Sequence, residues 1–217
     1  MSVYTKHSDI WKEIAGNPDF TSEASTGLPY AGGVYVCGFK NYWLLVGRDE
    51  TTSLWKTNQT DSPGTSSTDD GLANTNSINN TTHPAARWCK TYTSNVIGPW
   101  SSGQGYLPSI EELYVIYLNR TKLNSMHWIG TTIGTGIYWS STQAQMLPEG
   151  GWTSYALNFS NGNVIAVNKC ELGSGHGYSI RVRTGATGDH VSVHTISPYQ
   201  LTQNPIHRVR AVKRILI

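Results

Sequence analysis

The most informative stretch of this chain is Tyr138-Trp139-Ser140-Ser141-Thr142. Together with Ile137 it predicts a strand over residues 137–140, because aromatic and β-branched residues favour extended backbone. Two other informative stretches precede it. Residues 105–113 read Gly-Tyr-Leu-Pro-Ser-Ile-Glu-Glu-Leu, and residues 70–75 read Asp-Gly-Leu-Ala-Asn-Thr. We interpret the first as the start of a helix and the second as part of an ordered loop.

The helix start at Ser109 is the clearest local signal. Ser109 and Glu112 form a capping box, in which the side chain of each residue satisfies a free backbone N–H of the other. An apolar stripe at helical spacing follows. It comprises Ile110, Leu113, Tyr114, Tyr117 and Leu118. A second helix is predicted over residues 84–92, because Pro84 suits a first turn and apolar residues recur there every three or four positions.

Most of the remaining chain alternates with period two, which predicts short strands. Asn161-Gly162 is typical of a tight hairpin turn between two of them. Residues 51–82 are dense in Ser, Thr, Asn, Asp and Gly, and we interpret them as a long surface loop pinned by a few apolar side chains. The predicted strands cover residues 33–39, 42–46, 137–140, 153–159, 163–167, 178–183 and 208–213.

The composition favours a β-rich domain. Charged residues make up 14% of the 217 residues, against about 25% in a typical domain. The eight Trp and twelve Tyr suit short strands joined by polar loops, and they do not suit a helical bundle. A formal charge of +2 is too small to indicate nucleic-acid binding. No apolar run approaches the roughly 18 residues that a membrane span needs.

These stretches resemble a bacterial and phage branch of the C-type-lectin-like fold, a group of domains of unknown function related to the fibrobacter-type major paralogous domain. The 84–92 helix and the Phe159-Ser160-Asn161-Gly162 hairpin add to the resemblance, which runs from about residue 33 to the C-terminus. It implies an α+β, β-rich fold with two helices, long loops and paired N- and C-terminal strands. Two segments fit the closing strand of that family, residues 178–183 and 207–214. We favour the second.

The expected domain organisation has two parts. Residues 1–27 carry a hairpin-like pattern too short to fold alone, and we interpret them as an attachment arm. Residues 28–217 form the C-type-lectin-like domain, with residues 184–205 as a possible insertion. The N-terminus has no apolar signal-peptide core, which favours a phage structural protein over an exported adhesin.

One basic cluster lies near the C-terminus, and it alternates with small apolar residues. Such alternation is typical of a strand with one solvent face, so we expect these side chains to be exposed on a terminal strand. The cluster consists of His207, Arg208, Arg210, Lys213 and Arg214.

Metal and catalytic chemistry find little support in the sequence. Cys37, Cys89 and Cys170 are odd in number and widely spaced, which favours free buried thiols. In residues 147–152, which come nearest to a lectin calcium loop, Glu149 is the only anion, whereas calcium needs six to eight oxygen ligands. His190 and His194 are the only closely spaced histidine pair, and the strand-like residues between them favour an exposed face over a metal site. We therefore expect no cofactor, no metal and no catalysis.

The better functional candidates are polar and aromatic side chains in loops. Loop-borne Trp and Tyr give a large contact area at low entropic cost, and they stack on the faces of sugars. Trp100 and Trp152 stand among Gly and Ser residues, and Tyr178 lies close to His176. The predicted ligand-binding set is Trp100, Trp152, Tyr178, His176, Gln143, Gln145 and Glu149.

The resemblance implies a function in recognition. We expect a non-catalytic phage virion protein, either a receptor-binding tip or a capsid or tail decoration, present as a homo-oligomer or in repeated copies. Its partners would be virion proteins, through the N-terminal arm, and a host surface glycan or protein, with neither nucleic acid nor membrane insertion. Two alternatives remain open. One is a bacterial surface or filament protein of the same fold, located extracellularly. The other is an enzyme of the formylglycine-generating type, which would use Cys37 and Cys89.

Overall fold

The computed structural model describes residues 25–58, 60–144, 153–170, 182–183 and 205–217. Within these residues the chain forms an α+β, β-rich domain with one mixed sheet of eight strands. The strands are β1 Pro29–Tyr30, β2 Gly33–Phe39, β3 Tyr42–Ser53, β4 Ile137–Gln143, β5 Thr153–Asn158, β6 Asn163–Asn168, β7 Val182–Arg183 and β8 His207–Leu216. The helices are α2 Gly71–Ser77, α3 Pro84–Thr91 and α4 Ile110–Asn124.

The last strand, β8, lies in the middle of the sheet, whose order is β1-β2-β3-β8-β4-β5-β6-β7. It runs antiparallel to β3 from the Ser53↔His207 pair to the Tyr42↔Leu216 pair, and parallel to β4. The expected pairing of the first and last strands is therefore wrong. The outer edge of β2 is already occupied, because Gly27 and Leu28 exchange backbone hydrogen bonds with Tyr35. Only the β3 edge of the β2–β3 hairpin is left for β8.

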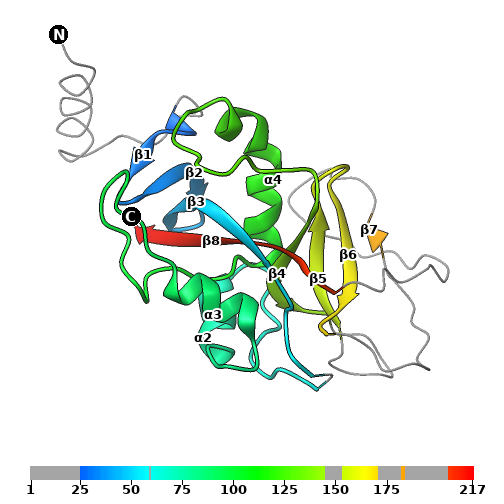
Figure 1. Cartoon of the computed structure of the whole chain (residues 1–217). Helices are drawn as coiled ribbons and strands as arrows, with labels where there is room; N and C mark the ends of the chain where they lie inside the picture. The colour runs from blue at the N-terminus through cyan, green and yellow to red at the C-terminus, as the bar shows by residue number, and fades with distance from the viewer. Residues whose placement is uncertain (1–24, 59, 145–152, 171–181, 184–204) are drawn as a thin grey trace, which may run out of the picture.

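Helices α3 and α4 cover opposite faces of this sheet (Figure 1). Alternate residues of a strand point to opposite faces, and on β8 Val212 packs in the cluster of α4 whereas Val209 and Ala211 pack in the cluster of α3. The α4 cluster also buries residues of β2, β3 and β5. The α3 cluster includes Trp55, Trp100 and Trp139. Residues 209–213 of this central strand are therefore buried on both faces, whereas the Arg208 side chain before them is 40% exposed.

The predicted solvent face of the basic cluster is accordingly wrong. Arg210 is 2% exposed, and His207 and Lys213 are also buried. Burial of these charges is compensated by partners: Arg210 donates to Glu50 at 2.8 Å and to the carbonyl of Gly47 at 2.9 Å. Arg208 also binds Glu50. A buried carboxylate thus holds two cations of β8 on the α4 side of the sheet.

The helix predicted from the capping box is confirmed, with both hydrogen bonds of the box present. The carboxylate of Glu112 does more than cap, because it also accepts hydrogen bonds from Tyr42 of β3 at 2.5 Å and from Tyr106 at 2.7 Å. The backbone N–H of Gly71 donates to the same carboxylate at 3.2 Å. Glu112 is 0% exposed. Burial raises the pKa of its carboxyl group, and the surrounding donors oppose that rise.

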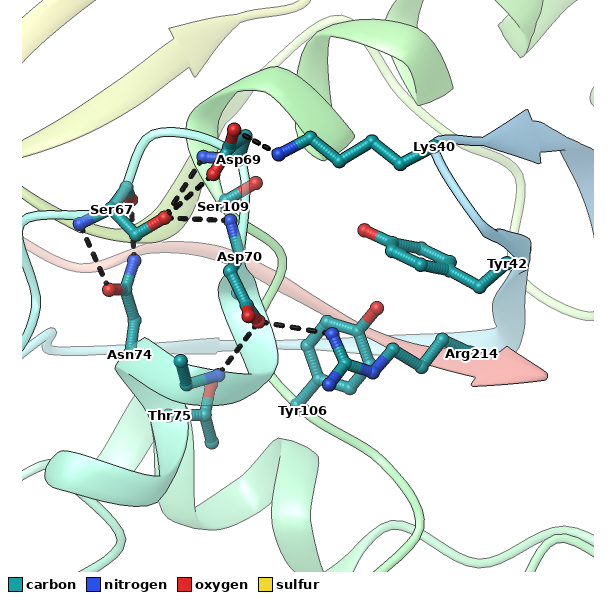
Figure 2. Close-up of polar contacts among 12 residues, drawn as sticks. Lys40, Tyr42, Ser67, Asp69, Asp70, Asn74, Thr75, Tyr106, Ser109 and Arg214 are labelled. Carbon is teal, nitrogen blue, oxygen red and sulfur yellow. Dashed lines mark hydrogen bonds and ion pairs between the residues drawn. The ribbon is translucent and has the colours of Figure 1, made fainter. Parts of the chain in front are cut away.

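The segment interpreted as a loop over residues 70–75 is helical instead. Asp70 caps α2 by accepting a hydrogen bond from the backbone N–H of Ala73. A short helix can begin here because its neighbours hold it: Arg214 of β8 donates to Asp70 at 3.1 Å, and Lys40 in the β2–β3 turn binds Asp69 (Figure 2). Sequence composition suggested a loop because helix propensity is low for Gly, Asn and Thr, and tertiary contacts overrode it.

Other boundaries shift modestly. The strand predicted over residues 42–46 extends to Ser53, and the Asn161-Gly162 turn belongs to a four-residue connection between Asn158 and Asn163. Of the segment predicted over residues 178–183, only 182–183 is described, and it pairs with β6. Residues 1–24 of the expected arm, which was predicted over residues 1–27, lie outside the described residues. Residues 184–204 of the expected insertion, which was predicted over residues 184–205, also lie outside the described residues.

The apolar stripe of α4 supplies a direct test of the packing. Leu113 is buried against the sheet whereas Leu118, also predicted to face the core, is 61% exposed. Leu113→Ala should lower the free energy of unfolding by about 2–5 kcal/mol, because a buried cavity adds to the lost transfer energy. Leu118→Ala on the same helix is the matched control and should change it by no more than about 0.5 kcal/mol. Urea denaturation measures both, and equal losses would contradict this packing.

Two adjacent glutamates test the buried carboxylate. Glu112→Gln should cost at least about 1.5–3 kcal/mol of unfolding free energy, because the new amide N–H₂ faces donors in place of an acceptor. Glu111→Gln should cost less than about 0.5 kcal/mol, since Glu111 makes an exposed hydrogen bond to Thr68. Thermal or urea unfolding of the two variants measures the difference. A Glu112→Gln protein as stable as Glu111→Gln would show that the carboxylate is not central.

Candidate functional site

The structure describes two of the seven predicted ligand-binding residues, and it separates them. Trp100 lies in the segment between α3 and α4, and Gln143 is the last residue of β4. The other five lie outside the described residues: Gln145, Glu149, Trp152, His176 and Tyr178.

Trp100 is part of the core, so its prediction as an exposed ligand contact is wrong. Its side chain is 1% exposed and packs edge-to-face on Tyr92 at 5.1 Å between ring centroids. Two glycines make room for the indole: a Cβ atom would lie 2.9 Å from its ring at Gly33 and 3.2 Å from its Nε1 at Gly105. The surrounding Gly and Ser residues suggested an exposed loop, but here the glycines serve close packing.

Gln143, in contrast, belongs to a buried polar group that we call the Ser62 cluster, formed by Lys56, Ser62, His83, Gln143 and Lys169. Lys56 follows β3, Lys169 follows β6, and His83 is the N-cap residue of α3. The backbone N–H of Lys56 donates to the carbonyl of Lys169 at 3.0 Å, which joins the ends of the two strands. The cluster therefore lies where β4, β6 and the chain leaving β3 meet.

The hydroxyl of Ser62 is the centre of this cluster. Its oxygen accepts hydrogen bonds from Lys56 at 3.0 Å and from Lys169 at 3.3 Å. It also lies 2.9 Å from Nε2 of His83. The other ring nitrogen of His83 lies 2.8 Å from the side-chain oxygen of Asn80, which can only accept. Nδ1 of His83 therefore carries the proton, and Nε2 accepts from Ser62.

Burial lowers the pKa values of the basic side chains in the cluster, which favours their neutral forms. The pKa of His83 is lowered to about 4, mainly by burial and further by Lys56 and Lys169. The pKa of Lys169 is lowered to about 7, by burial first and by the charge of Lys56 second. Burial also lowers the pKa of Lys56. Lys169 in addition lies over the ring of Trp55, 4.5 Å from the centroid, where a cation is favoured.

Gln143 joins the cluster through both ends of its carboxamide. Its oxygen accepts a hydrogen bond from the backbone N–H of Ser62 at 2.8 Å and another from Lys169. Its nitrogen donates to the carboxylate of Asp61. That hydrogen bond is the main reason that the pKa of Asp61 lies below its ordinary value. The side chain is 9% exposed, so most of it serves the interior.

The chemistry open to this cluster is limited by its saturation. A serine hydroxyl paired with a histidine resembles the nucleophiles of hydrolases. Ser62 is only 3% exposed, however, and its oxygen already accepts from two lysines. That arrangement suits a cross-brace between a loop and two strand ends. Within the described residues no group of three His, Cys, Asp or Glu side chains could hold a metal ion.

Cys89 and Cys170 are buried, as expected, whereas Cys37 is only partly buried. Burial raises the pKa of the Cys37 thiol to about 11. Cys37 packs against the α4 cluster and Cys89 lies in the α3 cluster, so the sheet separates the pair that the formylglycine-generating alternative would use.

Sequence reasoning missed Lys56, Ser62, His83 and Lys169 as a group. Their positions are spread over more than a hundred residues, and no spacing links them. No linear signal points to Lys169, which follows the polar Asn168, because lysine is almost never fully buried unless it is paired.

Comparison of the chain with protein-family models, curated proteins and solved structures found no match. In the part of the chain that the structure describes, no helix has both the length and the apolar character that crossing a bilayer requires.

The lowered pKa of His83 predicts how stability depends on pH. The unfolded histidine binds a proton near its ordinary pKa of 6.5, whereas the folded one stays neutral to about 4. The unfolded state therefore takes up protons first, and stability should fall between pH 6.5 and 4, by up to about 1.4 kcal/mol per pH unit for this group. Urea denaturation of His83→Gln should show a shallower fall over that window.

His207 adds to the same fall, because burial lowers its pKa to about 4 as well. His207→Gln should therefore reduce the slope too, and the two substitutions together should reduce it further. His127→Gln, which removes an exposed histidine, is the control for the substitution itself. A wild-type slope in His83→Gln would contradict the buried, neutral state of this side chain.

Proposed function

We propose that this chain is a non-catalytic recognition domain of the C-type-lectin-like type, carried on a phage particle and directed at a host surface ligand, with glycan as the favoured class. The observation that carries the proposal is the Ser62 cluster. It braces the ends of β4 and β6, from which residues 145–152 and 171–181 continue in the sequence. Gln145, Glu149, Trp152, His176 and Tyr178 belong to those two segments.

Binding by residues 145–152 and 171–181 is favoured when the strand ends that precede them are held in place. Binding loses less conformational entropy when the ends of a recognition segment are already held. Here Gln143 ends β4 and Lys169 follows β6, and their side chains contact each other. The polar groups of the cluster bind one another, which favours a scaffolding role over catalysis on an outside substrate.

The arrangement of the chain ends supports a separate anchoring end. Ile217 donates its backbone N–H to the carbonyl of Asn41, at the start of β3. The Ser62 cluster lies beyond the other end of that strand, about 35 Å away along a fully extended strand of this length. The C-terminus lies away from β5 and β6 in Figure 1. Thr26, at the end of the predicted arm, donates to the carbonyl of Val36 in the β2–β3 hairpin. We assign attachment to this arm, residues 1–27, and recognition to the end that holds the Ser62 cluster.

Trp152→Ala tests the recognition end. It should weaken binding to host cells or to a glycan array at least about tenfold, since tryptophan is among the residues that contribute most to binding energy at interfaces. Incorporation into particles and the melting temperature should not change. Trp88→Ala, which removes a half-buried tryptophan of α3, is the matched control and should leave binding at the wild-type level.

Deletion of residues 1–24 tests the other end. The truncated domain should fold and bind the ligand but should no longer enter particles. Cutting at residue 24 leaves Thr26 in place, whose hydroxyl donates to the carbonyl of Val36. Full incorporation of the truncated protein, or unchanged binding by Trp152→Ala, would refute the respective assignment.

A further inference from the structure

Two side chains of the Ser62 cluster are placed as reactants. Nζ of Lys169 contacts the carboxamide oxygen of Gln143, and the carbonyl carbon is one bond of about 1.2 Å further on. Lys169 is 0% exposed, so bulk water has little access to the contact. A nucleophile held against a carbonyl group in this way gains the large advantage of an intramolecular reaction.

The surrounding groups are placed to assist nucleophilic attack on that carbonyl carbon. The backbone N–H of Ser62 donates to the carboxamide oxygen at 2.8 Å, where negative charge would develop. The carboxylate of Asp61 accepts from the carboxamide nitrogen, which would be the leaving group, and can relay a proton to it. Both groups come from neighbouring residues of one turn.

The amine also meets the requirement of a nucleophile, which is to be unprotonated. Desolvation and the nearby ammonium of Lys56 lower the pKa of Lys169 to about 7, the two devices by which lysine nucleophiles are activated. Its oxygen partners are Thr60, Ser62 and Gln143, and among the described residues no carboxylate forms an ion pair with it. The charge of Asp61 and the ring of Trp55 favour the ammonium form, but burial and Lys56 outweigh them, so the neutral amine is well populated near pH 7 and predominates above it.

We infer that Lys169 and Gln143 form an intramolecular isopeptide bond. The lone pair of Nζ forms a bond to Cδ of Gln143, and the bond from Cδ to Nε2 breaks. One proton moves from Nζ to Nε2, with the Asp61 carboxylate as relay, and one ammonia leaves. The reaction needs no oxidant, cofactor or second protein. Its product is a neutral secondary amide in place of a buried amine and a primary amide.

The bond would join the end of β4 covalently to the residue that follows β6. It closes a loop over residues 143–169 that contains β5 and β6. Closing such a loop restricts the unfolded chain, and a neutral amide removes the cost of burying an ammonium group. A recognition end stiffened in this way would resist mechanical load and proteolysis.

Intact-mass spectrometry of the full-length protein tests the inference. The wild type, incubated folded at about pH 9 where the amine is neutral, should weigh one ammonia less than its sequence. Peptide mapping should yield a branched peptide that joins Gln143 to Lys169. Mapping is needed because Asn161-Gly162 can also lose ammonia, by forming a cyclic imide within its own peptide.

Two conservative variants complete the test. Lys169→Arg keeps the charge but should yield no branched peptide at Gln143 and should melt at a lower temperature than the wild type. Lys56→Arg is the matched control: Lys56 touches Ser62 but not Gln143, and this variant should still lack one ammonia. A wild type at full sequence mass after incubation, or a lost ammonia that maps to Asn161, would overturn the inference. Neither result bears on ligand binding, so the isopeptide bond and the proposed function are tested independently of each other.

Discussion

The buried carboxylate of Glu112 receives hydrogen bonds from donors that lie far apart in the sequence. Tyr42 opens β3, Gly71 opens α2, and Tyr106 and Ser109 lead into α4. A carboxylate without these donors would be costly at this depth, so each element must be in place for the others to be stable. This single group therefore sets how α4 sits on the sheet and where the segment between β3 and α3 must turn.

The central position of β8 imposes the second constraint. The middle of this strand is buried on both faces, yet it carries Arg210 and Lys213, with the partly exposed Arg208 beside them. The Glu50 carboxylate neutralises the two arginines on the α4 side. Lys213 donates to the carbonyl of Ala31 and the side chain of Gln104 on the other side. A different register would leave these buried charges without their partners, so the charges specify how the last strand pairs with its neighbours.

The Ser62 cluster extends the same logic to the end of the domain that we assign to recognition. Its polar groups satisfy one another, and so they hold two strand ends together without a metal ion in the described residues. The inferred bond between Lys169 and Gln143 would make that brace permanent. On the phage particle that we propose, such a covalent brace would help the recognition segments to resist proteases and shear.

The local elements of this protein can be predicted from its sequence alone. The capping box of Ser109 and Glu112, the Pro84 helix and the period-two strands depend on residues a few positions apart, so a linear pattern reveals them. Only the tertiary structure decided which faces are buried. The sequence could not show that β8 is central, that Trp100 fills space left by Gly33 and Gly105, or that Lys56, Ser62 and Lys169 meet. Burial and charge pairing depend on contacts between distant segments, and chain topology alone creates those contacts.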